Sequence, residues 1–441
     1  MKKITLASRI LQKIRVRREL VKLNNKKIRK SLLASKFKDR TRSRISQAKL
    51  EHLESYLKIS CQKMKVKKRQ DEWELTIPED FSLYRQPEKV LSIINEIAQL
   101  KKYPQIRTIF INHINCIKHD LAAEILLASS VNSLKSFKTR KGARFRVKGI
   151  FPTDPKMCRL MRSIGIVHEL GNIKYQVQQK DKLRLFKRES QLTEKTDIFG
   201  KDKKTRATED FTVHLNSCLS FINGKLDEDE SKKLDKYLGE VLGNAEEHSG
   251  KKLWHIVGYL DGTTEDEIYS EIIIFNVGKT IFETFEEKKD VSIVYDELKH
   301  YISLHGKNFT DEQLTMVYSL QQNVSSKKDE EIDRGQGSKY LIDLFHHLSD
   351  ECNRIKEIQQ IEHDNGDPTM LILSGGTMLK FDGKYLPEIK DEQKMVYAFN
   401  ETNDLDKAPD YCYTPRLEKV AFPGTAIYIK FPLNQKGDTN E

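Results

Sequence analysis

The segment 240–250 reads EVLGNAEEHSG and brings together side chains that suit a magnesium–nucleotide site. Glu240, Asn244 and His248 are spaced four residues apart, so on a helix they lie along one face. A carboxamide oxygen can ligate Mg²⁺, and a carboxylate can take a proton from an attacking water molecule. The spacing therefore predicts a nucleotide site, and the alternative is a solvated polar helix face.

The elements around this segment must position these side chains. The segment belongs to a predicted helix with an apolar stripe made of Leu234, Tyr237, Leu238, Val241 and Leu242. Residues 268–278 read IYSEIIIFNVG, which is typical of a buried strand. Residues 333–338 read DRGQGS and open into a helical run over 339–348, where glycines let the backbone approach an anion at the helix N-terminus. A hairpin over 370–383 and a strand over 422–433 follow.

In this order the elements resemble the GHKL ATPase domain shared by gyrase B subunits, MutL, histidine kinases and anti-sigma-factor kinases. Residues 240–248 match its N-box, 276–278 its first glycine box and 334–338 its second. Pro423-Gly424-Thr425 matches the closing Gly-Thr before the last strand. The resemblance covers the predicted domain 208–435 and implies a GHKL-type α/β sandwich that binds ATP and Mg²⁺.

The resemblance also implies a role for each matched residue. Glu240 is expected to be the general base that activates water, and Asn244 is expected to ligate magnesium. Asn276 is expected to hold the adenine amino group, and His248 either contacts phosphate or caps the helix. The remaining cofactor-binding residues are expected to shape the pocket: Gly278 beside the base, Arg334, Gly335, Gly337 and Ser338 around the phosphates, and Thr425 on the adenine side.

Two residues depart from the family pattern. Asn276 stands where the family usually has an aspartate, and its neutral amide oxygen can still accept a hydrogen bond from an adenine amine. Thr280 stands where the first box usually has a second glycine. The segment 279–334 between the two boxes would be the ATP lid, with a mobile stretch at 325–331 that orders over nucleotide.

The first half of the chain predicts a compact α/β domain over 72–178. Strands are expected over 73–77, 107–111, 144–150 and 173–177, and helices over 88–100, 120–134 and 155–162. This unit resembles a STAS domain, the fold of anti-sigma-factor antagonists, which implies an interaction module for a protein partner. Antagonists of that family carry a phosphorylatable serine at the start of the helix after the central strand. Here Lys118-His119-Asp120 stands at that place, so the phosphoswitch is expected to be absent.

Charge is distributed unevenly along the chain. Residues 1–70 carry 24 lysines and arginines against 4 acidic residues, a net charge of +20, so the whole-chain value of +12 leaves −8 for the remainder. This basic arm is expected to be mainly helical and to bind nucleic-acid phosphates. Contact with an acidic protein surface and binding to an anionic membrane are the alternatives. Residues 179–207 are highly charged without periodicity, which predicts a linker.

Composition excludes several other classes of protein. The six cysteines are scattered without a CxxC pair, which argues against a zinc site or a disulfide framework and favours a cytoplasmic location. No apolar run approaches the ~20 residues that span a bilayer, so no transmembrane segment is expected.

Three functions follow from these expectations. The first is an ATP-binding conformational switch that hydrolyses ATP slowly and couples its nucleotide state to a protein or nucleic-acid partner. The second is a serine or histidine protein kinase that acts on a separate protein. For a histidine kinase the phosphoacceptor is missing, because His214 lacks an acidic neighbour and His168-Glu169 lies at a strand edge. The third is a degenerate nucleotide-binding fold that serves only as a scaffold.

Overall fold

In the computed structural model, the described residues form one compact unit within 49–441. The residues that the structure describes are 51–58, 64–67, 69–142, 144–171, 182–190, 202–222, 224–248, 253–263, 268–287, 293–321, 342–343, 345–346, 349, 368–390 and 394–433.

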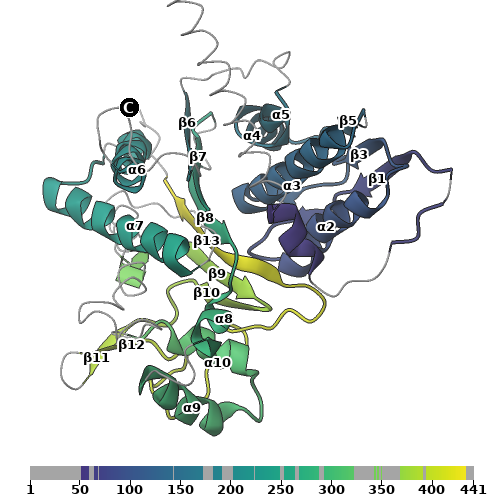
Figure 1. Cartoon of the computed structure of the whole chain (residues 1–441). Coiled ribbons are helices and arrows are strands. Elements are labelled where there is room, and N and C mark those ends of the chain that lie inside the picture. The colour runs from purple at the N-terminus through teal and green to yellow at the C-terminus, as the bar shows by residue number, and fades with distance from the viewer. Residues whose placement is uncertain are drawn as a thin grey trace, which may run out of the picture. The chain divides into compact units, whose positions relative to one another are not determined.

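A six-stranded sheet forms the centre of the described chain, in the order β10-β9-β13-β8-β7-β6 (Figure 1). Every neighbouring pair in it is antiparallel. The strands are β6 (Leu183–Glu189), β7 (Trp254–Asp261), β8 (Tyr269–Val277), β9 (Thr369–Gly375), β10 (Thr377–Phe381) and β13 (Phe422–Pro432). Strand β8 is buried along both faces from Ile272 to Val277, which explains its unbroken apolar run.

Helices cover one face of this sheet. They are α6 (Lys203–Leu219), α7 (Glu228–His248), α8 (Ile281–Glu286), α9 (Ile293–His305) and α10 (Asp311–Tyr318). Their buried residues share one core with alternate residues of the strands, such as Ile256 on β7 and Ile274 on β8. Small elements complete this half: η3 (Ser220–Ile222), β11 (Glu388–Lys390) and β12 (Lys394–Val396).

The first half of the chain forms a parallel α/β module. Its sheet has the order β1-β3-β5, made of β1 (Glu72–Thr76), β3 (Thr108–Asn112) and β5 (Arg146–Ile150). Its helices are α2 (Pro87–Gln99), η1 (Leu100–Lys102), α3 (Leu121–Arg140), α4 (Pro155–Ser163) and α5 (Ile166–Glu169). A short parallel pair, β2 (Asp80–Phe81) and β4 (Lys118–His119), precedes α3. The predicted alternation of strands and helices is confirmed up to α4, and the expected strand over 173–177 lies outside the described residues.

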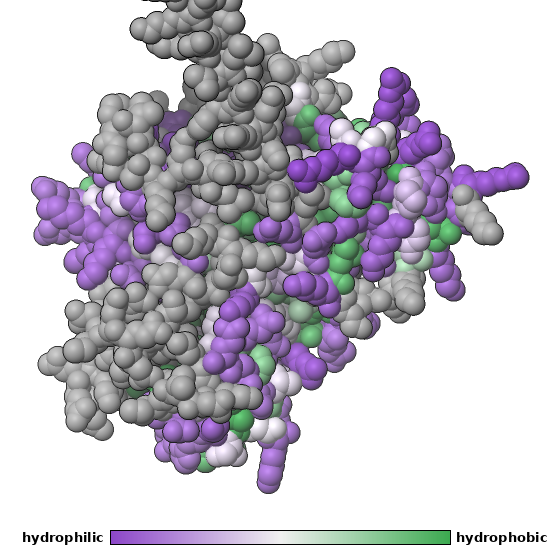
Figure 2. All heavy atoms as spheres, in the orientation of Figure 1, coloured by the Kyte–Doolittle hydropathy of each residue, from purple (hydrophilic) through white to green (hydrophobic). Residues whose placement is uncertain are grey.

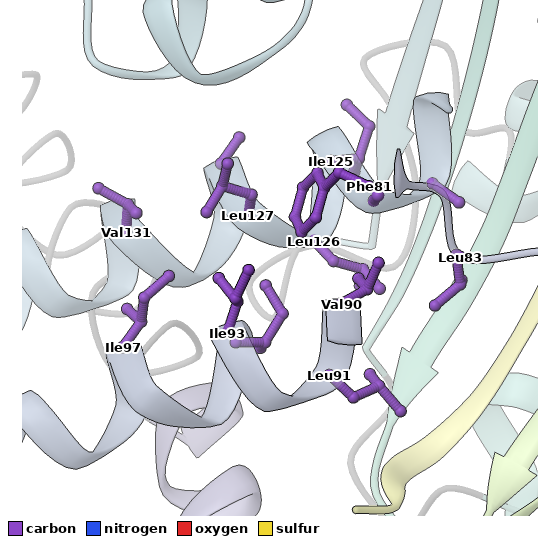
Figure 3. Packing of buried hydrophobic residues seen from close by; sticks show 14 of the residues in the cluster. Phe81, Leu83, Val90, Leu91, Ile93, Ile97, Ile125, Leu126, Leu127 and Val131 are labelled. Atoms are coloured by element: carbon purple, nitrogen blue, oxygen red, sulfur yellow. The ribbon is translucent and has the colours of Figure 1, made fainter. Parts of the chain in front are cut away.

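Helices α2 and α3 lie between the two sheets (Figure 1). They pack against each other through aliphatic side chains such as Val90 and Ile97 on α2 and Leu127 and Val131 on α3 (Figure 3). The same core includes Phe275 of β8 and its neighbours on the second face of the six-stranded sheet. The chain therefore combines a parallel and an antiparallel sheet in one α/β and α+β architecture with alternating helix and sheet layers.

Polar contacts join the parallel module to the six-stranded sheet. The Glu271 carboxylate of β8 accepts hydrogen bonds from the Leu121 backbone N–H at 2.8 Å and the Tyr428 hydroxyl at 2.6 Å. Arg159 Nε of α4 lies 2.7 Å from the Asp261 carboxylate of β7. The N-terminus of α3 is thus covered by the protein's own sheet.

Two expectations about segments outside the domains need correction. Part of the expected linker 179–207 is strand β6, which pairs with β7 along seven residues from Leu183 to Glu189, and α6 begins at Lys203. The end of the expected basic arm is also built into the body. Residues 51–57 are helical, and Leu53 and Tyr56 are fully buried in the core that contains α2 and α3. Residues 1–50 of the arm lie outside the described residues.

Candidate nucleotide site

Helix α7 carries Glu240 and Asn244 on its exposed side. The helix begins with a reciprocal cap, in which Asp227 accepts from the Glu230 N–H at 2.8 Å and Glu230 accepts from the Asp227 N–H at 2.7 Å. The predicted stripe is confirmed, since Leu234, Leu238, Val241 and Leu242 are buried and Tyr237 packs against them. Figure 2 shows hydrophilic side chains gathered over the outer side of α7.

Two hydrogen bonds fix the rotation of α7 on the sheet. Thr212 of α6 donates to Asp235 at 2.6 Å, and the Trp254 indole N–H of β7 donates to Glu246 at 2.8 Å. This flank of α7 therefore faces α6 and β7. At 100° per residue, Asn244 lies about 200° around the helix from Glu246, so Asn244 and Glu240 lie on the opposite flank.

A polar row crosses the sheet at one level. Trp254 of β7 pairs with Asn276 of β8, Asn276 pairs with Thr425 of β13, and Thr425 pairs with Ser374 of β9. Ile274, Ile372 and Ile427 lie two positions along their strands from Asn276, Ser374 and Thr425 and belong to the core that includes α6 and α7. The row therefore lies on the same side of the sheet as α7. The sequence-predicted Asn276 and Thr425 are thus direct neighbours on adjacent strands.

In this row the Ser374 hydroxyl is hydrogen-bonded, whereas the Asn276 carboxamide has no partner among the described residues. The Ser374 hydroxyl accepts from the Ile281 N–H at 2.9 Å, lies 2.9 Å from the Gly424 carbonyl oxygen and lies 3.2 Å from the Thr425 hydroxyl. Asn276 is only 7% exposed, and its carboxamide makes no hydrogen bond to another described residue. Its carboxamide oxygen and nitrogen are not among the fully buried side-chain atoms that lack a partner, so they reach the surface, where water or a ligand can bind them.

Gly424 lets the two strands of the row approach closely. Its φ is +146°, and a Cβ added there would lie 2.1 Å from the Asn276 carbonyl oxygen. Beside it, the Gly278 N–H donates to the Pro423 carbonyl at 3.0 Å. The glycines of the predicted first box and closing Gly-Thr therefore meet across β8 and β13.

Thr280, which stands where a glycine was expected, caps the N-terminus of α8. It is the N-cap of α8, where its hydroxyl accepts from the Glu283 N–H at 3.1 Å and Glu283 accepts from the Thr280 N–H at 2.8 Å. A threonine provides this cap, which a glycine would lack.

The described part of the expected lid is helical. Residues 281–318 contain α8, α9 and α10, and Phe285, Leu298 and Leu314 are buried in the same core as α7. The role of 279–334 as an ATP lid stays a prediction. The stretch 325–331 lies outside the described residues.

The second glycine box is not described. Arg334, Gly335, Gly337 and Ser338 lie in the segment 322–341, outside the described residues, as does the side chain of His248. The structure thus brings together Asn276, Gly278 and Thr425 and positions α7 beside them, while the phosphate-binding residues stay predictions.

Sequence reasoning missed two residues close to the row. Ser374 is the second-last residue of β9 and directly precedes Gly375-Gly376 in the hairpin. A hydroxyl next to this glycine pair was the sequence signal that could have identified it. Glu312 of α10 packs against this turn and accepts from the Gly376 N–H at 3.0 Å. Burial raises the pKa of the Glu312 carboxyl, which its hydrogen bond from Gly376 and the charge of Arg416 partly offset.

The described residues hold no ready-made metal centre: no group of three His, Cys, Asp or Glu side chains there could hold an ion. Among the described helices, none combines the length and apolarity needed to cross a membrane.

His214 is unsuited to phosphotransfer. It is 7% exposed, stacks on Phe186 at 5.5 Å between ring centroids, and lies 3.6 Å from the Cys218 sulfur. Burial and the charge of Arg184 lower its pKa to about 4.

Comparison with known proteins brings out no relative: no protein-family model, no curated protein and no solved structure matches this chain.

Proposed function

We propose that the chain binds a magnesium–adenine nucleotide between α7 and the Asn276–Thr425–Ser374 row, and that this nucleotide state controls its hold on a partner. The observation that carries the proposal is the Asn276 side chain, which is only 7% exposed, lacks a hydrogen-bond partner among the described residues and lies beside Thr425 on the α7 side of the sheet. The GHKL-like order of elements gives the same assignment independently.

Each residue has a task in this proposal. The Asn276 amide oxygen accepts a hydrogen bond from the exocyclic adenine amine, and the Ser374 hydroxyl holds Thr425 in place at 3.2 Å. Asn244 offers its amide oxygen to Mg²⁺, and Glu240 accepts the proton of an attacking water molecule. The ion and nucleotide supply an activated phosphoryl group once bound. Arg334, Gly335, Gly337 and Ser338 complete the proposed phosphate side.

Calorimetric titration of the full chain with Mg-ATP tests the adenine assignment. Asn276→Ala should weaken binding about tenfold or more, because it removes this acceptor. Asn276→Asp should retain binding or tighten it, because a carboxylate is the stronger acceptor. Asn115→Ala, the same change at an exposed residue of the parallel module, is the matched control and should bind as the unaltered chain does. Equal losses in Asn276→Asp and Asn276→Ala would contradict the role of Asn276.

Turnover is tested with Glu240→Ala. This variant should bind Mg-ATP normally and release phosphate at least ~100-fold more slowly, as removal of a general base does. If neither form binds ATP in a magnesium-dependent manner, the nucleotide proposal is wrong. Binding without turnover by the unaltered chain would favour the scaffold alternative.

We propose that the basic arm contacts nucleic acid. A truncation that tests this must keep the helix at 51–57, which is part of the core. A chain that starts at Lys49 keeps the buried Leu53 and Tyr56, whereas one that starts at residue 71 removes them. The truncation at 49 should lose salt-sensitive binding to DNA and RNA and keep ATP binding. Unchanged retention on nucleic acid would place the contact elsewhere.

A further inference from the structure

The parallel sheet has one face that none of the described helices covers. Trp73 and Leu75 of β1 and Ile109 and Ile111 of β3 point toward α2 and α3, as the hydrogen bond from the Trp73 indole to Glu96 at 2.6 Å also indicates. Because side chains alternate along a strand, the residues between them point the other way. This outer face consists of Glu72, Glu74, Thr76, Thr108, Phe110, Asn112, Arg146, Lys148 and Ile150.

The outer face is accessible in the chain. The Glu72 and Lys148 side chains are 46% and 53% exposed, and Ile150 is 41% exposed. Parallel sheets are usually covered on both faces, so an accessible face of this kind calls for a partner.

Charges on the outer face are sorted by strand. Across the three strands, Glu74 of β1 pairs with Phe110 of β3, which pairs with Lys148 of β5. In the same way, Glu72 of β1 and Arg146 of β5 flank β3 at the neighbouring level of the outer face. Strand β1 is thus acidic on this face, β5 is basic, and β3 between them carries an aromatic ring. Lys148 reaches across the face to Glu72 at 3.1 Å, so its ammonium group lies above the sheet.

This pattern is complementary to itself. A two-fold axis parallel to the strands, placed above β3, sets β1 of one copy over β5 of the other. Glu74 then faces the Lys148 of the second copy, Glu72 faces its Arg146, and the two Phe110 rings meet at the axis. An axis perpendicular to the strands would instead place acidic β1 on acidic β1.

We propose that the outer face of β1-β3-β5 is the contact surface of a symmetric dimer of this chain, with the two sheets packed face to face. Three strands of five residues give a face of about 14 by 17 Å, which is small beside the ~800 Å² per partner of a standard interface. The dimer is therefore expected to be weak and concentration-dependent, with dissociation in the micromolar range or above.

Sedimentation equilibrium of the full chain, without nucleotide, tests the proposal over about 5 to 300 µM. Glu74→Lys and Lys148→Glu should each weaken the dimer about tenfold or more, because each change replaces two attractive contacts with two repulsive ones. The double variant Glu74→Lys/Lys148→Glu should dimerise as the unaltered chain does, since its charges are again complementary. Glu228→Lys is the control, because it makes the same charge change at an 85% exposed site on α7.

An equimolar mixture of the two single variants gives the sharpest readout. One variant presents lysine at 74 and at 148, and the other presents glutamate at both, so they should form a mixed dimer although neither dimerises alone. A chain that stays monomeric to the highest concentration would overturn the proposal. A dimer that persists in both single variants would also overturn it, because it would use another surface.

Discussion

His214 should make the stability of the protein fall as the medium becomes acidic. Its pKa is lowered from 6.5 to about 4 in the folded chain by burial and by the charge of Arg184. Between these two values the unfolded chain binds a proton that the folded chain does not. The neutral His214 therefore makes its full contribution to the free energy of unfolding above pH ~6.5, and this contribution is lost as the pH falls toward 4.

The size of the effect follows from the two pKa values. With 6.5 and about 4, protonation of the unfolded chain at pH ~5 lowers the free energy of unfolding by about 2 kcal/mol relative to pH ~7.5. His214→Gln removes the titrating group and keeps a polar atom near the Cys218 sulfur. Between these pH values, the free energy of unfolding of the variant should fall by about 2 kcal/mol less than that of the unaltered chain.

Urea unfolding followed by the fluorescence of the two tryptophans, Trp73 and the 1% exposed Trp254, provides the measurement at both pH values. The comparison uses the difference between the two chains, so every other titrating group cancels. His300→Gln is the matched control because His300 lies on the surface of α9. If His214→Gln and the unaltered chain lose the same free energy on acidification, His214 titrates normally in the folded protein and the reasoning is refuted.

Further predictions concern the helix at 51–57 and the strand crossing at the site, both measured by urea unfolding at neutral pH. Leu53→Ala should cost about 2–5 kcal/mol, because the side chain is fully buried and leaves a cavity. Tyr56→Phe should cost less than about 1 kcal/mol, because the buried Tyr56 hydroxyl has no hydrogen-bond partner among the described residues; a large loss would reveal such a partner. Gly424→Ala should cost several kcal/mol, since its Cβ would lie 2.1 Å from the Asn276 carbonyl oxygen. Gly142→Ala has a φ of +77° but no atom within 4 Å, so it should cost only about 1 kcal/mol of backbone strain; equal losses at both glycines would contradict the close-approach explanation.

The parallel module was predictable because its signals are local. Helix α3 begins at the N-cap Asp120, and strand β3 is an uninterrupted β-prone run. Strand β6 was missed because LRLFKRE at a sheet edge is mostly charged, and only Leu183 and Phe186 are buried. Its place in the sheet depends on pairing with β7, more than sixty residues further along the chain.

The helices in the expected lid also had sequence signals. Thr280 with Glu283 and Thr310 with Gln313 form capping boxes, which mark the starts of α8 and α10. These helices were not predicted, because the whole segment 279–334 was assigned to the ATP lid on the family resemblance. For the site, the sequence placed Asn276 and Thr425 at two strand ends, and only the pairing of β8 with β13 makes them neighbours.

The hydrogen bond between Leu121 and Glu271 spans 150 residues and has a consequence for folding during synthesis. At ~5–20 residues per second, a ribosome needs about 8–30 s after it has made the start of α3 before Glu271 is made. During that interval the apolar side of α3 that later meets β8 is without its sheet. The nascent first half is therefore expected to need a chaperone, or to stay loosely packed, until the strands of the second half are available to cover it.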